Sequence, residues 1–137
     1  MALKNVVSDV FNISEFQTSG FPWVIYATTS GTSVNTHSFS RVSKNVTVKN
    51  NDASGKNLRI GFTLNGVNGN GGKYYFFLEG GQSMTFDAKI TDIFVRADTS
   101  NTINYSVYAS LTTVLPTAMP FLSGTLQDGS AGWGGVG

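Results

Sequence analysis

Cysteine is absent from the 137 residues of this chain, and charged residues are scarce. Without cysteine there are no disulfide bonds and no thiolate metal ligands. Asp, Glu, Lys and Arg together make up 12% of the sequence, about half the usual share, and the formal net charge is +1. The basic residues are spread along the chain. We therefore expect no nucleic-acid partner and no attraction to an anionic membrane.

A single histidine, His37, limits the chemistry that the chain can perform. Paired-histidine metal sites are excluded within one chain. A Ser–His–Asp triad is formally possible, but the sequence contains no Gly-x-Ser-x-Gly motif. We predict that His37 is a half-exposed strand residue. Asp87 and Asp92 flank a short turn and could form a carboxylate pair, although Asp is common at strand ends. The prediction is a protein that is not an enzyme and needs no cofactor.

Long hydrophobic runs are also missing. No stretch approaches the roughly 20 apolar residues that a membrane-spanning helix needs. No apolar run follows the lysine in the opening Met-Ala-Leu-Lys-Asn, so these residues do not resemble a secretory signal peptide. We expect a chain that is made in the cytoplasm and has no membrane partner.

What the sequence does contain is apolar residues at every second position. Leu58, Ile60, Phe62 and Leu64 alternate with smaller or polar residues, which is typical of a strand with one buried face. Similar alternation or apolar runs predict strands at 23–28, 34–42, 46–48, 58–64, 73–79, 84–86, 90–97 and 103–111. Residues 6–13 are a further strand or an extended arm.

Short turn-forming segments separate these strands, among them Asn50–Gly55, Asn68–Gly72, the pair Gly80-Gly81 and Asp98–Asn101. Connections this short predict antiparallel neighbours joined as hairpins. The glycine-rich stretch Gly66–Lys73 does not match a phosphate-binding loop and is expected to be a mobile hairpin loop. No segment shows helical periodicity. The fold class predicted is an all-β antiparallel β-sandwich, jelly-roll-like in topology.

Composition divides the chain into three parts. Residues 1–20 form an N-terminal arm or first strand, 21–115 the β-sandwich domain, and 116–137 an extended Gly/Pro-rich C-terminal tail. The tail carries spaced apolar residues, which are Phe121, Leu122, Leu126 and Trp133. Such a segment either docks on a partner surface, folds back on its own domain or stays disordered.

Consecutive aromatic residues mark the strand expected at 73–79. Its dense apolar run predicts a strand covered on both faces. Tyr74, Tyr75, Phe76 and Phe77 cannot all point to one face, however, so some of these rings must leave the core. We predict that Tyr74, Tyr75 and Phe76, together with the four apolar tail residues, contribute to a protein interface.

Residues 45–113 resemble small structural proteins of tailed-phage virions, of the head-decoration or accessory type. The segments that carry the resemblance are Val46–Asn50, Leu58–Gly66, Tyr74–Ser83 with its Leu-Glu-Gly-Gly-Gln-Ser sequence, Ile90–Ala97 with Ile-Phe-Val-Arg-Ala, and Asn104–Thr112. The resemblance covers about half of the chain and includes no catalytic motif.

The resemblance implies a capsid decoration or cement protein. Its partner would be the major capsid protein, which it would bind on the outer capsid lattice as a homotrimer, so its location would be the virion surface. The alternative is a carbohydrate- or receptor-binding module of a phage fibre or spike, which would use exposed aromatic residues near Trp23 or Tyr74.

Overall fold

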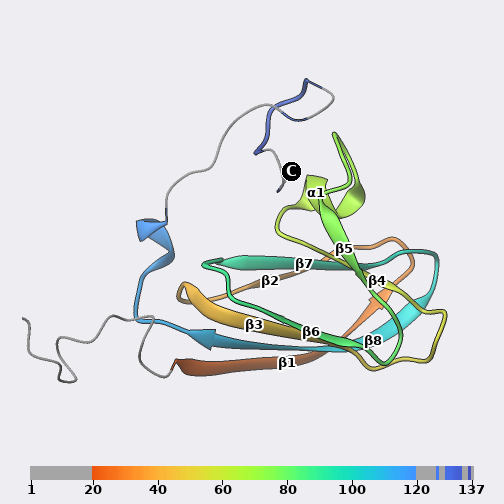
Figure 1. Ribbon diagram of the computed structural model, residues 1–137, viewed down its shortest axis with the longest axis horizontal. Coiled ribbons are helices and arrows are strands. Elements are labelled where there is room, and N and C mark those ends of the chain that lie inside the picture. The colour runs from red at the N-terminus through yellow and green to blue at the C-terminus, as the bar shows by residue number, and fades with distance from the viewer. Residues whose placement is uncertain (1–19, 120–125, 127–128, 134–135, 137) are drawn as a thin grey trace, which may run out of the picture.

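Two four-stranded antiparallel sheets face each other in the computed structural model, which describes residues 20–119, 126, 129–133 and 136 (Figure 1). The predicted all-β antiparallel sandwich is confirmed. The first sheet has the order β1 (Phe21–Ser30), β8 (Thr102–Leu111), β3 (Ser43–Asn50), β6 (Ser83–Phe86). The second has the order β2 (Asn35–Ser38), β7 (Asp92–Ala97), β4 (Leu58–Gly61), β5 (Tyr75–Leu78).

The strand pairing follows one rule. β1 pairs with β8, β2 with β7, β3 with β6 and β4 with β5, each antiparallel. Two further pairings, β3 with β8 and β4 with β7, complete the sheets. This is the pattern of one long hairpin, with its tip between β4 and β5, wrapped around a common core.

The prediction that short connections join neighbouring strands as hairpins is wrong for most of the chain. Of the consecutive strands, only β4 and β5 are paired among the described residues. Each other connection between consecutive strands, such as β3 to β4 or β5 to β6, crosses from one sheet to the other. The Gly80-Gly81 turn joins β5 of one sheet to β6 of the other. Sheets pack about 10 Å apart, which a few residues can span. A Cβ on Gly80 would overlap the carbonyl of Ala53, so this crossing requires glycine.

The core lies between the sheets and explains the period-two pattern. Val48 of β3 is paired with Val107 of β8, and Ile60 of β4 is paired with Val95 of β7. All four side chains are fully buried. Because successive side chains point to opposite faces, each of these strands also presents an outer row. The outer rows of the two sheets carry the candidate functional residues.

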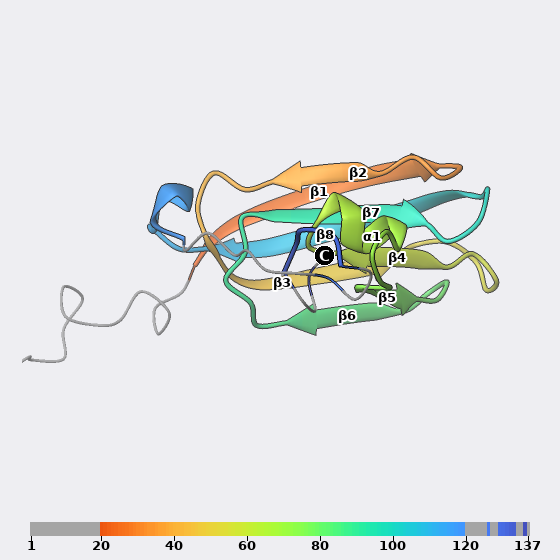
Figure 2. The same cartoon turned by 90° about the horizontal axis from the view of Figure 1, so that it is seen from above.

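A short helix corrects the prediction around residues 58–72. The strand expected to reach Leu64 ends at Gly61, and α1 (Leu64–Asn68) occupies part of the stretch expected to be a hairpin loop. Thr63 caps the helix by accepting a hydrogen bond from the Gly66 N–H at 2.9 Å. A five-residue helix is too short to show a helical period. Figure 2 shows α1 lying over the second sheet, where Val67 is fully buried against Gly61.

The strand predicted to be covered on both faces is not covered on both. β5 is at the edge of the second sheet, and the Phe77 side chain is 51% exposed. Its run of apolar residues reflects aromatic side chains on an outer face and not a second covering layer. The arm or strand predicted within residues 1–19 lies outside the described residues.

Candidate interaction surfaces

His37 is buried, which corrects the prediction of a half-exposed side chain. It is 9% exposed and its Nε2 lies 2.6 Å from the Tyr105 hydroxyl across the sandwich. Asn35 Nδ2 donates to the same hydroxyl at 2.9 Å. Burial lowers the pKa of His37 and raises the pKa of Tyr105 to about 12. His37 Nε2 and the Tyr105 hydroxyl therefore share a hydrogen bond that joins β2 to β8.

Asp92 has structural hydrogen-bond partners at the start of β7. Its carboxylate accepts from Ser38 Oγ at 2.5 Å and from Thr91 Oγ1 at 2.9 Å. Within the described part of the chain, no three metal-ligating side chains gather in one place. Over the same residues, no helix has the length and apolar character needed to cross a membrane. The Asp92 carboxylate is thus held by hydrogen bonds where β2 pairs with β7.

The aromatic residues of β5 separate onto two faces. Phe76 packs toward the core, with its ring 5.9 Å from that of Phe86. Tyr75 and Phe77 point outward, and their rings meet edge to face at 5.5 Å. Tyr74 precedes the strand and its ring lies against Gly72. Phe77, which was not among the predicted interface residues, is the most exposed of the four.

Two arginines accompany these outward rings. The guanidinium carbon of Arg59 lies 4.4 Å from the centre of the Tyr75 ring, and Arg59 Nε donates to Asp98 Oδ1 at 2.7 Å. Arg96 is directly opposite Arg59 in the register of β4 and β7. Sequence analysis missed this cluster, because it depends on the pairing of strands that are not consecutive. Its signal is that both arginines occupy outward positions of alternating strands.

The described part of the C-terminal tail contacts the sandwich. Leu126 is buried, and the Val136 carbonyl accepts from Thr63 Oγ1 at 2.7 Å. Trp133 remains 42% exposed. Phe121 and Leu122 lie outside the described residues. Folding back on the domain, one of the alternatives considered for the tail, is therefore what Val136 does.

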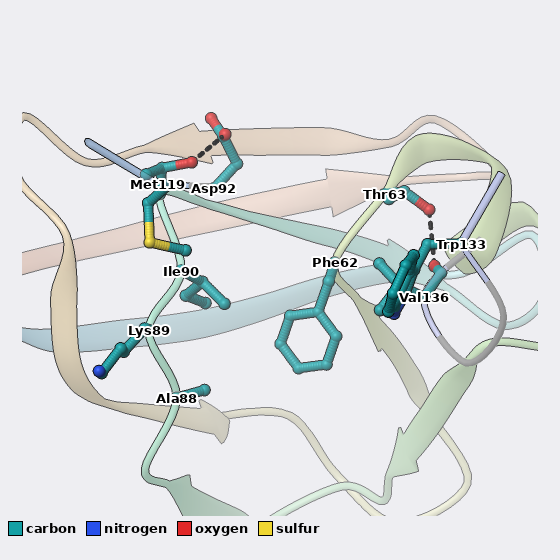
Figure 3. Close-up of a pocket in the computed structure, with 10 residues that line it drawn as sticks. Phe62, Thr63, Ala88, Lys89, Ile90, Asp92, Met119, Trp133 and Val136 are labelled. Carbon is teal, nitrogen blue, oxygen red and sulfur yellow. Dashed lines mark hydrogen bonds between the residues drawn. The ribbon is translucent and has the colours of Figure 1, made fainter. Parts of the chain in front are cut away.

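A mainly apolar cavity of about 400 Å³ separates the tail from the end of the sandwich (Figure 3). Phe62 lies at its centre, between Ile90 and Met119 on one side and Trp133 and Val136 on the other. Its polar lining side chains are Thr63, Lys89, Thr91 and Asp92; Thr63 donates to the Val136 carbonyl and Thr91 to the Asp92 carboxylate. The tail therefore covers an apolar end of the sandwich without filling it.

The outer face of β1 and β8 is an uncharged surface with exposed aliphatic and aromatic side chains. Val24 and Tyr26 are 72% and 65% exposed, and Tyr108, directly opposite Val24, is 42% exposed. The other outward positions of these two strands are Pro22, Thr28, Ser30, Thr102, Asn104, Ser106 and Ser110, of which Ser110 is buried. None of these side chains carries a charge. The face combines aromatic and aliphatic groups with small polar ones.

No protein family model matches the chain, and no curated protein shows significant sequence similarity to it. Two surfaces of the domain differ in chemistry: the uncharged outer face of β1 and β8, and the arginine and aromatic cluster over β4, β5 and β7.

Proposed function

We propose that this protein is a non-enzymatic structural component of a virus particle, a capsid decoration or cement protein. In this proposal it binds the major capsid protein on the outside of the lattice, as a homotrimer. The observation that carries the proposal is the exposed, uncharged outer face of β1 and β8. Tyrosine enrichment and depletion of charge are the compositional features of the centre of a protein interface.

The strand order supports this role. We infer a jelly-roll-like topology from the pairing of β1 with β8, β2 with β7, β3 with β6 and β4 with β5 in two sheets. This architecture recurs in viral capsid and lectin domains. Because one fold hosts many functions, the strand order raises the expectation of a binding role without selecting the partner.

The geometry of the outer face is suited to packing against another flat surface. β1 and β8 are each ten residues long and pair along their whole length, so the face is a continuous antiparallel ribbon. Val24 and Tyr108 lie opposite each other near its middle. A contiguous exposed patch of this kind is typical of a protein-binding site. In a lattice, many weak contacts of one patch add through multivalency.

Binding to particles tests the proposal directly. Particles of the encoding virus that lack this protein are incubated with the purified chain and sedimented. The wild-type chain is expected to bind to saturation, whereas Val24→Asp is expected to bind about tenfold or more weakly, because a desolvated carboxylate would have no partner in the interface. Val24 is exposed, so this substitution leaves the core unchanged.

Phe77→Asp supplies the matched control, because Phe77 is a comparably exposed apolar residue on the other sheet. Its binding to particles is expected to equal that of the wild type. Equal binding by Val24→Asp and wild type would contradict the assignment of this face. Absence of wild-type binding, or a monomer in analytical ultracentrifugation, would contradict the capsid role or the trimer, respectively.

A further inference from the structure

The outer face of the second sheet holds two arginines side by side. Arg59 and Arg96 are paired across β4 and β7, and both point away from the core. Asp98 is the one carboxylate that forms an ion pair with either of them among the described residues, with Arg59 Nε 2.7 Å from its Oδ1. The pair of guanidinium groups therefore keeps a surplus of positive charge in a chain that has little charge elsewhere.

Both guanidinium groups are held in place by the protein. Arg59 is fixed by its ion pair and by the Tyr75 ring, 4.4 Å away. Arg96 donates from Nε to the Ala97 carbonyl at 3.1 Å and from Nη1 to Asn68 Oδ1 at 2.7 Å. Orientation before binding reduces the entropy that a ligand must overcome.

Several arginine donors remain available. Neither Nη atom of Arg59, nor Nη2 of Arg96, has a protein acceptor in the part of the chain that the structure describes. The Arg59 side chain is 18% exposed and Arg96 is 9% exposed, so Arg59 is the more accessible of the two. A planar guanidinium with two free Nη groups matches the geometry of a carboxylate.

An aromatic surface adjoins the arginines. Phe77 is directly opposite Arg59 in the register of β4 and β5, and half of its side chain is exposed. Its ring meets Tyr75 edge to face, which fixes the orientation of both rings. A cationic group beside an exposed ring suits a ligand that has an anion and an apolar ring face within one unit.

We propose that Arg59, Arg96 and Phe77 form a binding site for a carboxylated sugar, a uronic or sialic acid unit of a glycan. The ligand carboxylate accepts from the Nη groups, and the apolar face of the sugar ring packs on Phe77. Sugar hydroxyls donate to the Asp98 carboxylate. The acidic side chain of a protein partner would use the arginines but would supply no hydroxyl for Asp98.

Two further observations agree with an anionic ligand at this place. Burial, and then the neighbouring charge of Arg59, lowers the pKa of Arg96, so an anion would relieve an unfavourable environment. The site is also on the sheet opposite the proposed capsid-binding face. The two proposals are therefore independent, and each can fail while the other holds.

Titration of the full ¹⁵N-labelled chain with sodium glucuronate tests the site by NMR. The arginine Nε signals of Arg59 and Arg96 are expected to shift in a saturable manner. Glucose, which lacks the carboxylate, and sodium acetate, which lacks the ring, are each expected to bind about tenfold or more weakly, because each loses one of the two contacts. Acetate or glucose binding as tightly as glucuronate would overturn the proposal.

Substitutions locate the site. Phe77→Ala and Arg59→Gln are each expected to weaken glucuronate binding about tenfold, because one removes the ring contact and the other the charge. Tyr26→Ala, an exposed ring lost from the opposite sheet, is the matched control and is expected to bind as the wild type does. Unchanged binding by folded Phe77→Ala would overturn the site, as would tighter binding of tetraglutamate than of glucuronate.

Discussion

The two outer faces of this sandwich are built on one core but differ in nearly every other respect. The β1–β8 face is uncharged, and among the described residues none covers Val24, which is 72% exposed. The face over β4, β5 and β7 carries two arginines and is partly covered by α1, where Val67 is fully buried. In this small sandwich the alternating pattern therefore determines which side chains form the core, while the outward rows of the two sheets differ in charge and polarity.

The largest difference between the two faces is expected when Val67 and Val24 are each replaced by alanine. Val67→Ala is expected to lower the free energy of unfolding by about 2 kcal/mol, because it leaves a cavity between α1 and Gly61. Val24→Ala is expected to change it by less than about 0.5 kcal/mol, because that side chain is exposed. Urea denaturation of both variants measures the difference. Equal losses would mean that the β1–β8 face is covered in the isolated chain.

The hydrogen bond between His37 and Tyr105 joins the two sheets, and the pKa of His37 makes the stability of the domain depend on pH. The pKa of His37 is lowered in the folded state, so the imidazole stays neutral while the unfolded chain takes up a proton below pH 6.5. Stability is therefore expected to be complete above pH 6.5 and to fall as the pH drops from there toward the folded-state pKa. Denaturation with urea between pH 7.5 and 5 measures the fall.

His37→Gln removes the titrating group and is the control for this pH dependence. Its stability is expected to be lower than that of the wild type at pH 7.5 but nearly constant down to pH 5. Asp52, whose pKa is lowered from 3.8 by the Asn104 N–H and by Lys56, titrates below this range. A slope for His37→Gln as steep as the wild-type slope would show that another group is responsible.

The smallest effect is expected next to the uncharged face, in the outer row of β3 and β6. Thr47 and Thr85 share a 2.7 Å hydrogen bond on the outer side of β3 and β6. Thr47→Val is expected to change the free energy of unfolding by less than about 0.5 kcal/mol, because water replaces the lost partner. A loss above about 1 kcal/mol in urea denaturation would show that the outer row of β3 and β6 contributes to the stability of the domain.

Much of the fold could be predicted from local pattern. The period-two spacing of Leu58 and Ile60, and of the residues in β8, places side chains on the core or the surface without any knowledge of strand order. The pairing of non-consecutive strands could not be predicted, because a turn such as Gly80-Gly81 has the same composition whether it closes a hairpin or crosses between sheets. Helix α1 could not be predicted because it depends on the cap at Thr63 and on the packing of Val67 against Gly61.

The candidate sites depend on the part that could not be predicted. The sequence predicts that Tyr75 and Phe76 share an interface because they are adjacent, yet their side chains point to opposite faces of β5. Arg59 and Arg96 are far apart in sequence and meet only because β4 pairs with β7. A site assembled across strands in this way has no signature in a single sequence, whereas the exposed position of Phe77 follows from its spacing of two from Tyr75.

The nested pairing of the strands has a consequence for how the chain reaches its native state. The β4–β5 ribbon closes a short loop, and each successive pair must bring together segments that are farther apart along the backbone, ending with β1 and β8. The entropy lost in closing such loops is recovered only after distant segments have met. Topologies dominated by long-range contacts fold slowly for this reason. We therefore expect the ribbon proposed to bind the capsid to be completed last, so that a finished binding face accompanies a finished domain.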